Sequence, residues 1–68
     1  MTESVLNTVS DLRQKEGLTQ EVFAQKVGVT RQTVIAIEKG NYTPSVLLAL
    51  KIAAHFKVPV EQIFSIKK

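Results

Sequence analysis

The chain has 68 residues, 44% of them hydrophobic, and nine Lys and Arg outweigh six Asp and Glu to give a net charge of +3. This length predicts one domain spanning residues 1–68, and the low Gly and Pro content favours a compact globule over disorder. The lack of cysteine excludes disulfides and thiolate metal sites, and without a signal peptide or an apolar run near the roughly 20 residues of a membrane span we expect a cytoplasmic protein.

The first predicted helix covers about residues 7–16, with Asn7 as its N-cap and Gly17 at its end. A start at Ser4 is an alternative, because it would add Val5 to the same apolar face. A third interpretation makes residues 4–7 a short strand before the helix. We favour the strand, because the other end of the chain also shows a strand pattern.

Two short helices joined by a tight turn are predicted over residues 20–27 and 31–39. Thr19 and Thr30 stand immediately before them, where a hydroxyl can accept from the free N–H groups of the first turn. Gly28 lies in the turn, at a position that favours a left-handed backbone conformation. A helix, a short turn containing Gly and a second helix together form a helix-turn-helix.

The helix predicted over residues 31–39 has an inner and an outer face. At about 100° per residue, Val34 and Ile37 share the inner face and are expected in the core. The other helices are expected to contribute Val9, Leu12, Phe23, Ala24 and Val27 to this core. The outer face has no carboxylate at its centre and carries Gln32, Ala36 and Lys39, with Thr33 and Ile35 at its borders.

The second half of the chain begins with a strong helix start signal. Thr43 as N-cap and Pro44 at the first helical position predict a helix that runs to about Phe56. It contains VLLAL followed by IAA, so it is apolar nearly all round and is either central or borders a partner surface. A last short helix, PVEQIF, follows, and residues 64–67 then alternate with the period of a strand. A lone strand must pair, and residues 4–7 are the obvious partner.

These residues resemble the lambdoid-repressor-like helix-turn-helix family, which contains phage repressors, Cro and many small bacterial regulators. The run LRQKEGLTQEVFAQKVGVTRQTVIAIEKGNYTPS, with LALKIAAHFKVP and the closing EQIF, carries the resemblance over about residues 7–64. It implies an all-α, compact five-helix fold with the helix-turn-helix at about residues 19–40. The short members that look most similar carry terminal strands, which supports a small two-stranded β element formed by the termini.

The resemblance also implies roles for single residues, because in this family the second helix of the motif enters the major groove of double-stranded DNA. Base contacts are implied for Arg31, Gln32, Thr33 and Ala36. DNA backbone contacts are implied for Thr19, Gln20, Thr30, Lys39, Asn41 and Tyr42, and Gln20 is also implied to brace the recognition helix. Arg13 and Glu38 match a structural ion pair that ties the first helix to the third.

Two positions depart from the family pattern. Ala36 stands where a polar reader is common and can touch only a thymine methyl group. Ile35 also replaces a commoner polar residue. We therefore expect a narrower and more methyl-dependent specificity than the family pattern suggests.

Physical dimensions agree with the resemblance. A helix about 10–12 Å across fits a major groove about 12 Å wide, where Arg pairs with guanine and Gln with adenine for roughly 1–3 kcal/mol each. Two such readers are too few for a long site, so we expect a homodimer on two half-sites about 34–36 Å apart. Its interface is expected to use spare apolar residues near the fourth and fifth helices, namely Leu47, Val60 and Phe64.

The sequence therefore predicts a transcriptional regulator, most simply a repressor that binds a near-palindromic operator. An antitoxin-type module that neutralises a regulatory protein partner and binds its own operator is the alternative. One histidine, His55, and no glycine-rich phosphate loop leave no catalytic constellation, so an enzyme is not expected. Neither a cofactor nor a metal site is expected, and His55 is assigned no role.

Overall fold

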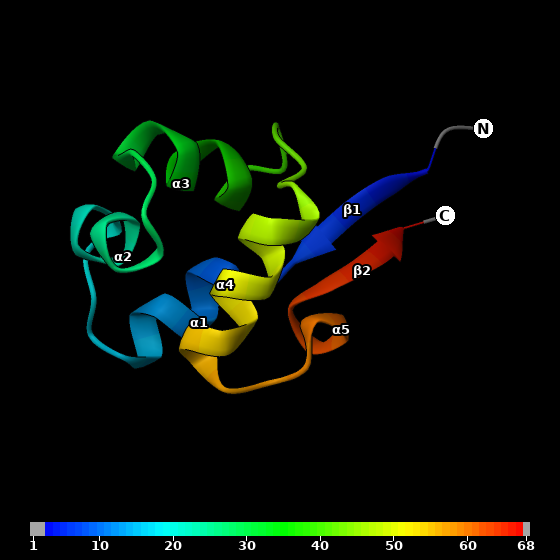
Figure 1. Cartoon of the computed structure of the whole chain (residues 1–68). Helices are drawn as coiled ribbons and strands as arrows, with labels where there is room; N and C mark the ends of the chain where they lie inside the picture. Colours follow the sequence, from blue (N-terminus) through cyan, green and yellow to red (C-terminus); the bar gives the residue numbers. More distant parts are fainter. Residues whose placement is uncertain (1–2, 68) are drawn as a thin grey trace.

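The computed structural model describes residues 3–67, which form five helices and a small two-stranded sheet. Figure 1 shows the helices packed into one body, from which the two strands extend together. The elements in chain order are β1 (Ser4–Asn7), α1 (Val9–Lys15), α2 (Gln20–Val27), α3 (Arg31–Glu38), α4 (Val46–Phe56), α5 (Val60–Ile63) and β2 (Phe64–Lys67). The expected five-helix fold with paired terminal strands is confirmed.

The terminal strands form an antiparallel ribbon. Ser4 is opposite Lys67, and Asn7 is opposite Phe64 at the base of the ribbon. The strand interpretation of residues 4–7 is therefore correct, and the alternative helix start at Ser4 is wrong. In Figure 1 the ribbon leaves the helical body beside α4 and α5, and the start of β1 lies next to the end of β2 at its far tip.

The core lies where the helices meet. Each helix contributes at least one buried apolar side chain, and Phe23 and Ile52 are fully buried. All five inner-face residues expected from the helix-turn-helix are buried, and Val9 is buried as well, whereas Leu12 is partly buried against the core. The complete buried set is Val9, Phe23, Ala24, Val27, Val34, Ile37, Leu48, Ile52, Ala53 and Ile63.

The start of α1 differs from the expectation. Asn7 belongs to β1, and the backbone N-cap is Thr8, whose side chain makes no cap hydrogen bond. The Oδ1 atom of Asn7 nevertheless accepts from the Val9 N–H over 3.1 Å, so Asn7 serves the first turn from one position earlier. Pairing with β2 keeps its backbone extended, which explains why the helix begins later than residue 7.

The start of α4 was also predicted wrongly. Ser45 is the N-cap, and its hydroxyl accepts from the Leu48 N–H over 3.1 Å. Thr43 and Pro44 belong to the preceding loop, not to the helix. Thr43 and Ser45 are both good caps, and a proline between them restrains its predecessor to extended conformations that fit the loop equally well.

The helix α4 is the longest helix of the fold, and only one side of it packs into the core. Leu48 and Ile52 are buried, whereas Val46, Leu47 and Leu50 are 77%, 65% and 54% exposed. No helix within residues 3–67 is both long and apolar enough to cross a membrane. We call the exposed apolar side of α4 the α4 patch and define it as Val46, Leu47 and Leu50.

Candidate nucleic-acid interface

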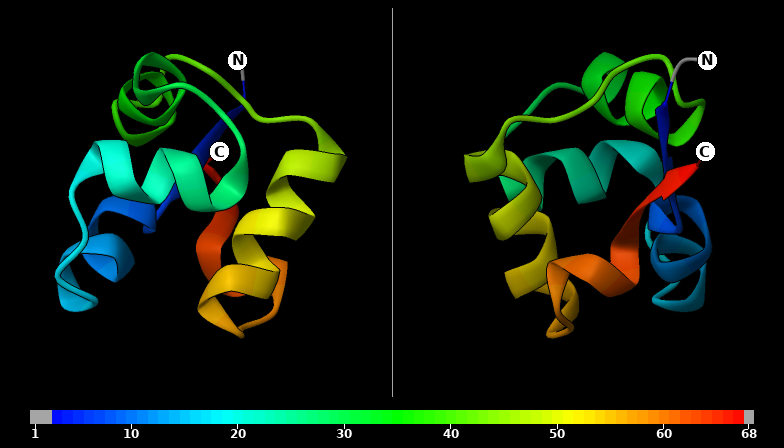
Figure 2. Two further views of the ribbon diagram at one scale, coloured as in Figure 1. Left: turned by 60° about the vertical axis from the view of Figure 1, so that its left-hand side comes forward. Right: turned by 90° about the vertical axis from the view of Figure 1, so that its right-hand side faces the viewer.

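The helices α2 and α3 form the expected helix-turn-helix. They cross at a steep angle, and α3 lies at the outer margin of the body in every view (Figures 1 and 2). Gly28 makes the turn with a φ of 76°, and the Val29 N–H donates to the Ala24 carbonyl over 2.9 Å. This left-handed position explains the glycine, because an L side chain would be strained there. The turn thus holds α3 across α2.

The caps of both helices match the expectation. The hydroxyl oxygen of Thr19 accepts from the Val22 N–H over 3.1 Å. That of Thr30 accepts from the Thr33 N–H over 3.3 Å and lies 3.1 Å from the Thr33 hydroxyl. Thr19 and Thr30 are both exposed, and the Thr19 hydroxyl can donate its hydrogen to a phosphate oxygen while its oxygen caps the helix.

The predicted base-reading residues lie on the outer side of α3. Arg31 and Gln32 are exposed in its first turn, while Thr33 and Ala36 are partly buried along its flank. The opposite side is anchored by Val34 and Ile37, each only 1% exposed. The helix therefore presents a guanidinium and an amide at its free N-terminal end, where major-groove readers of this type act.

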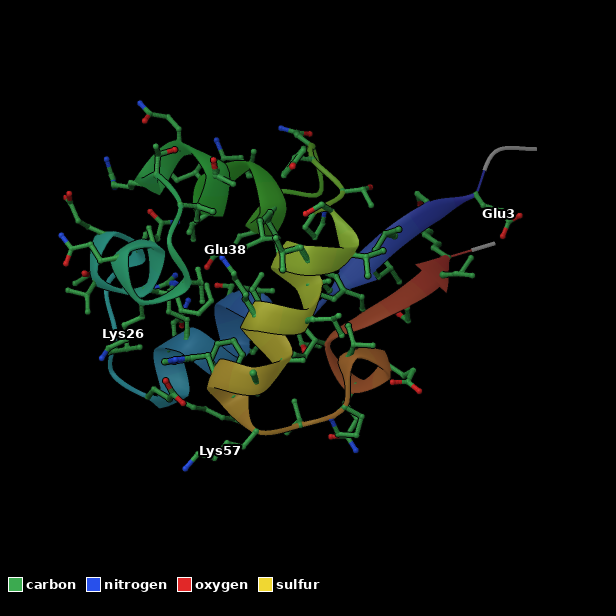
Figure 3. The ribbon with its side chains drawn as sticks, viewed as in Figure 1. Glu3, Lys26, Glu38 and Lys57 are labelled. Atoms are coloured by element: carbon green, nitrogen blue, oxygen red, sulfur yellow. The ribbon has the colours of Figure 1, made fainter. Side chains whose placement is uncertain are left out.

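The single carboxylate of α3 is turned away from this surface. Glu38 accepts from Arg13 in a fork, with Nε–Oε2 at 2.7 Å and Nη2–Oε1 at 3.2 Å. The two side chains keep only 11% and 8% exposure, and Figure 3 shows Glu38 on the inner side of α3. The hydrogen bonds that Arg13 donates to Glu38 raise the pKa of Arg13 above its already high usual value, against an opposing effect of burial. The expected ion pair is therefore present.

Gln20 joins the same network. Its Nε2 donates to Oε1 of Glu38 over 3.1 Å, so α2 and α1 hold the end of α3 from two sides. Arg13 also donates through Nη1 to the Leu18 carbonyl over 2.8 Å, which fixes the connection between α1 and α2. The bracing role implied for Gln20 thus has a contact in the structure. Its expected phosphate contact stays a prediction.

The remaining backbone candidates follow α3. Lys39, Asn41 and Tyr42 are all exposed, and Tyr42 keeps 45% of its surface. The Asn41 N–H donates to the Ala36 carbonyl over 2.9 Å, which ties this loop to the helix and leaves the Asn41 side chain outside. Together with Arg31, Lys39 gives the outer side of α3 a cation near each end. Within residues 3–67 no group of acidic, His or Cys side chains is arranged to hold a metal ion.

The expected interface residues separate into two kinds. Leu47 is 65% exposed and belongs to the α4 patch. Val60 and Phe64 are partly buried and pack against the core, so less of their surface is free. Leu47 and Tyr42 also line a shallow hollow of about 280 Å³ beside the turn between α2 and α3.

The sequence reasoning missed one contact of α3. Asn7 donates through Nδ2 to the carbonyl oxygen of Ile37 over 2.8 Å, which links the terminal ribbon to the end of α3. The only signal in the sequence was an amide side chain before α1, and it was read as a local cap. The sequence assigned no role to His55. Its Nε2 atom lies 2.7 Å from Oε1 of Glu16, and its ring packs against Phe23 and Phe56.

Comparison with known proteins gives a consistent result. The helix-turn-helix family pattern matches residues 9–63. The uncharacterized HTH-type transcriptional regulator YgzD of Bacillus subtilis is 55% identical over 58 residues, which cover 85% of this chain and 88% of that protein. The cryptic phage CTXphi transcriptional repressor RstR of Vibrio cholerae is 35% identical over 57 residues, 84% of this chain and 51% of that protein. Among solved structures, the restriction-modification controller protein C.AhdI of Aeromonas hydrophila superposes with a TM-score of 0.73 at 30% identity, over 79% of this chain and 82% of that one.

Proposed function

This chain belongs to the helix-turn-helix family of DNA-binding transcriptional regulators, and on that basis we propose that it is a repressor that binds a near-palindromic operator as a homodimer. The family consists of DNA-binding proteins and not of enzymes, so the chain acts by occupying DNA. The proposal assigns residues 1–68 to one DNA-binding domain that acts in the cytoplasm. The similarity to the phage repressor RstR supports the choice of repressor over activator.

The outer side of α3 carries this proposal. Arg31 and Gln32 are exposed there, and the carboxylate of Glu38 is bound inside the fold by Arg13 and Gln20. A free carboxylate on this side would repel DNA phosphates, whereas an inward, neutralised one leaves the surface cationic. Arg31 can then donate twice to guanine and Gln32 can pair with adenine.

The homodimer rests on the α4 patch. Three large apolar side chains at 54–77% exposure stand together on one helix of a small protein. Burying them against a second copy would remove this surface from water and place two recognition helices on one DNA duplex. If the chain is instead an antitoxin-type module, the partner protein that it neutralises would use the same patch. That alternative predicts a monomer in isolation and a complex with the partner.

A matched pair of lysine variants tests DNA binding by the proposed face. Affinity for a random-sequence duplex is measured by fluorescence anisotropy at rising salt for the wild type, Lys39→Ala and Lys67→Ala. The wild type should lose affinity steeply, since phosphate contacts release counterions. Lys39→Ala should reduce the slope by about one unit, and the ribbon control Lys67→Ala should leave it unchanged. Equal effects of the two variants, or a wild type without salt dependence, would contradict the proposal.

A further inference from the structure

We propose that Asn7 is a positioning residue for DNA recognition, through which the terminal ribbon holds the recognition helix α3 in the orientation that reads bases. This inference rests on the proposed function, since it concerns how α3 is aimed at the DNA. The contact that carries it is the 2.8 Å hydrogen bond from Asn7 Nδ2 to the Ile37 carbonyl. It spans 30 positions of the chain and is partly buried.

The orientation of the Asn7 amide is determined by its two partners. The Ile37 carbonyl oxygen can only accept, and the Val9 N–H can only donate. The amide therefore presents Nδ2 to Ile37 and Oδ1 to Val9, over 2.8 and 3.1 Å. A carboxylate or a short hydroxyl at this position could still serve Val9. Neither could donate to Ile37 in the same geometry.

The backbone of Asn7 is held as firmly as its side chain. Asn7 pairs with Phe64 in the ribbon register. The next residue, Thr8, donates its N–H to the Ile63 carbonyl over 3.0 Å. Because β1, β2 and the start of α1 all restrain it, Asn7 is a rigid support for whatever its amide contacts.

The Asn7 amide supports α3 at the carbonyl group of Ile37, in the last turn of the helix. The last four carbonyl groups of a helix have no partner within it. The Ile37 carbonyl accepts from the Gly40 N–H over 3.0 Å in the closing turn, and Asn7 supplies its second donor. The neighbouring Glu38 is held by Arg13 over 2.7 Å. One attachment alone would let α3 turn about it, whereas attachments at two consecutive residues, from β1 and from α1, also restrain the rotation of α3.

Rotation of α3 matters for base reading more than for phosphate binding. A bidentate contact from Arg31 to guanine needs both bonds aligned, and hydrogen bonds weaken steeply when they bend. A flexible lysine tolerates the same movement while it stays near a phosphate. Loss of the Asn7 anchor should therefore reduce discrimination between sequences and leave general DNA affinity nearly unchanged.

Two variants and one control test this inference in the full chain. Asn7→Asp keeps an acceptor for the Val9 N–H and removes the donor. Asn7→Ser keeps an uncharged hydroxyl that can accept from Val9 but is one bond shorter than the amide, so that it no longer reaches the Ile37 carbonyl. Ser4→Asp places the same new charge on the same strand, at an exposed position. Circular dichroism identifies conditions in which all proteins are folded. Affinity is then measured for the sequence that the wild type selects and for a scrambled duplex.

Both Asn7 variants should lose about three- to tenfold in the ratio of specific to scrambled affinity, and Ser4→Asp should match the wild type. Amide exchange at Gly40 and Asn41, which close the end of α3, should accelerate by a similar factor. Folded Asn7 variants with the wild-type ratio would overturn the inference, as would equal losses on both duplexes or unchanged exchange. Arg31→Ala, run in parallel, keeps the two proposals apart. If it loses discrimination while the Asn7 variants do not, only the role of Asn7 fails, and a wild type without sequence preference refutes the proposed function instead.

Discussion

The guanidinium of Arg13 in α1 forms a salt bridge with the carboxylate of Glu38 at the end of α3. The Nε and Oε2 atoms are 2.7 Å apart, and both side chains are at most 11% exposed. This contact joins α1 to α3 and turns an acidic group away from the side of α3 that is proposed to face DNA. Gln20 completes it by donating to the second carboxylate oxygen. These three residues therefore affect both the stability of the fold and the charge on the surface of α3.

Removing one partner of this pair should destabilise the protein. Glu38→Ala leaves the Arg13 charge almost buried without a counter-charge, which should lower the free energy of unfolding by about 3 kcal/mol. The double variant Arg13→Met with Glu38→Leu should recover most of that loss, because apolar pairs often replace buried ion pairs at little cost. Urea denaturation of Glu38→Ala and of the double variant measures both effects. A loss below about 1 kcal/mol in the single variant would show that the pair behaves as a surface contact.

Arg13 itself should add no pH dependence to this stability across the neutral range. Its pKa in the fold is raised above the value in the unfolded chain. A raised pKa contributes stability that is fully present below the unfolded value and is lost only when the pH rises through the folded one. For an arginine both lie in strong alkali, so this contribution stays constant in any physiological buffer.

A conservative substitution distinguishes the base contact expected of Arg31 from the effect of its positive charge. Arg31→Lys keeps the cation but loses the planar fork that donates two bonds to guanine. Discrimination at one base pair should fall by about 1–3 kcal/mol, roughly five- to 150-fold, while affinity for scrambled DNA changes little. Titrations on single-base variants of the selected site measure this. Retention of full discrimination by Arg31→Lys would show that the planar fork of Arg31 does not read the base pair.

The methyl group of Ala36 offers a test of the expected thymine contact. Replacing one thymine of the site by uracil removes a single methyl group, which should cost about 0.8 kcal/mol, or about fourfold in affinity. In Ala36→Gly the same replacement should cost nothing, since the protein methyl is absent. A uracil effect of equal size in both proteins would mean that another residue contacts this base.

If the α4 patch is the interface of the proposed homodimer, a charge placed on it should separate the two copies. Leu47→Glu leaves the core intact, because Leu47 is 65% exposed, but it should give a monomer in sedimentation equilibrium. Affinity for the full operator should then fall by about 100-fold or more, as expected when bivalent binding is lost. Leu6→Glu is the matched control, since Leu6 is 50% exposed on the ribbon. If Leu6→Glu dissociates the dimer and Leu47→Glu does not, the interface lies on the ribbon.

Local patterns were sufficient to predict most of the fold. The caps at Thr19 and Thr30, the turn at Gly28 and the inner faces of α2 and α3 follow from residue type and helical period, and the structure confirms them. The predicted start of α4 was wrong, because Thr43 and Ser45, on either side of Pro44, are equally good caps. A choice between them depends on where the loop must run, and that is a property of the whole fold.

Contacts between distant residues were harder to predict. The pairing of Arg13 with Glu38 came from the family resemblance and is confirmed. The resemblance also implied a bracing role for Gln20, but not that its partner would be Glu38. The bond from Asn7 to Ile37 was missed entirely, since a local cap already explained an asparagine before α1. No period or spacing in the sequence indicates which carbonyl, 30 residues away, an amide will meet.

Selection of bound duplexes from a random DNA pool tests the central claim most directly, when wild type and Arg31→Ala are compared. The account predicts that the wild type enriches a near-palindromic site with half-sites about 34–36 Å apart, one helical turn of DNA. Arg31→Ala should enrich sites that have lost one symmetric pair of guanines and keep the same spacing. A wild type that enriches no sequence, or an Arg31→Ala profile identical to that of the wild type, would contradict the assignment of α3 as the helix that reads DNA.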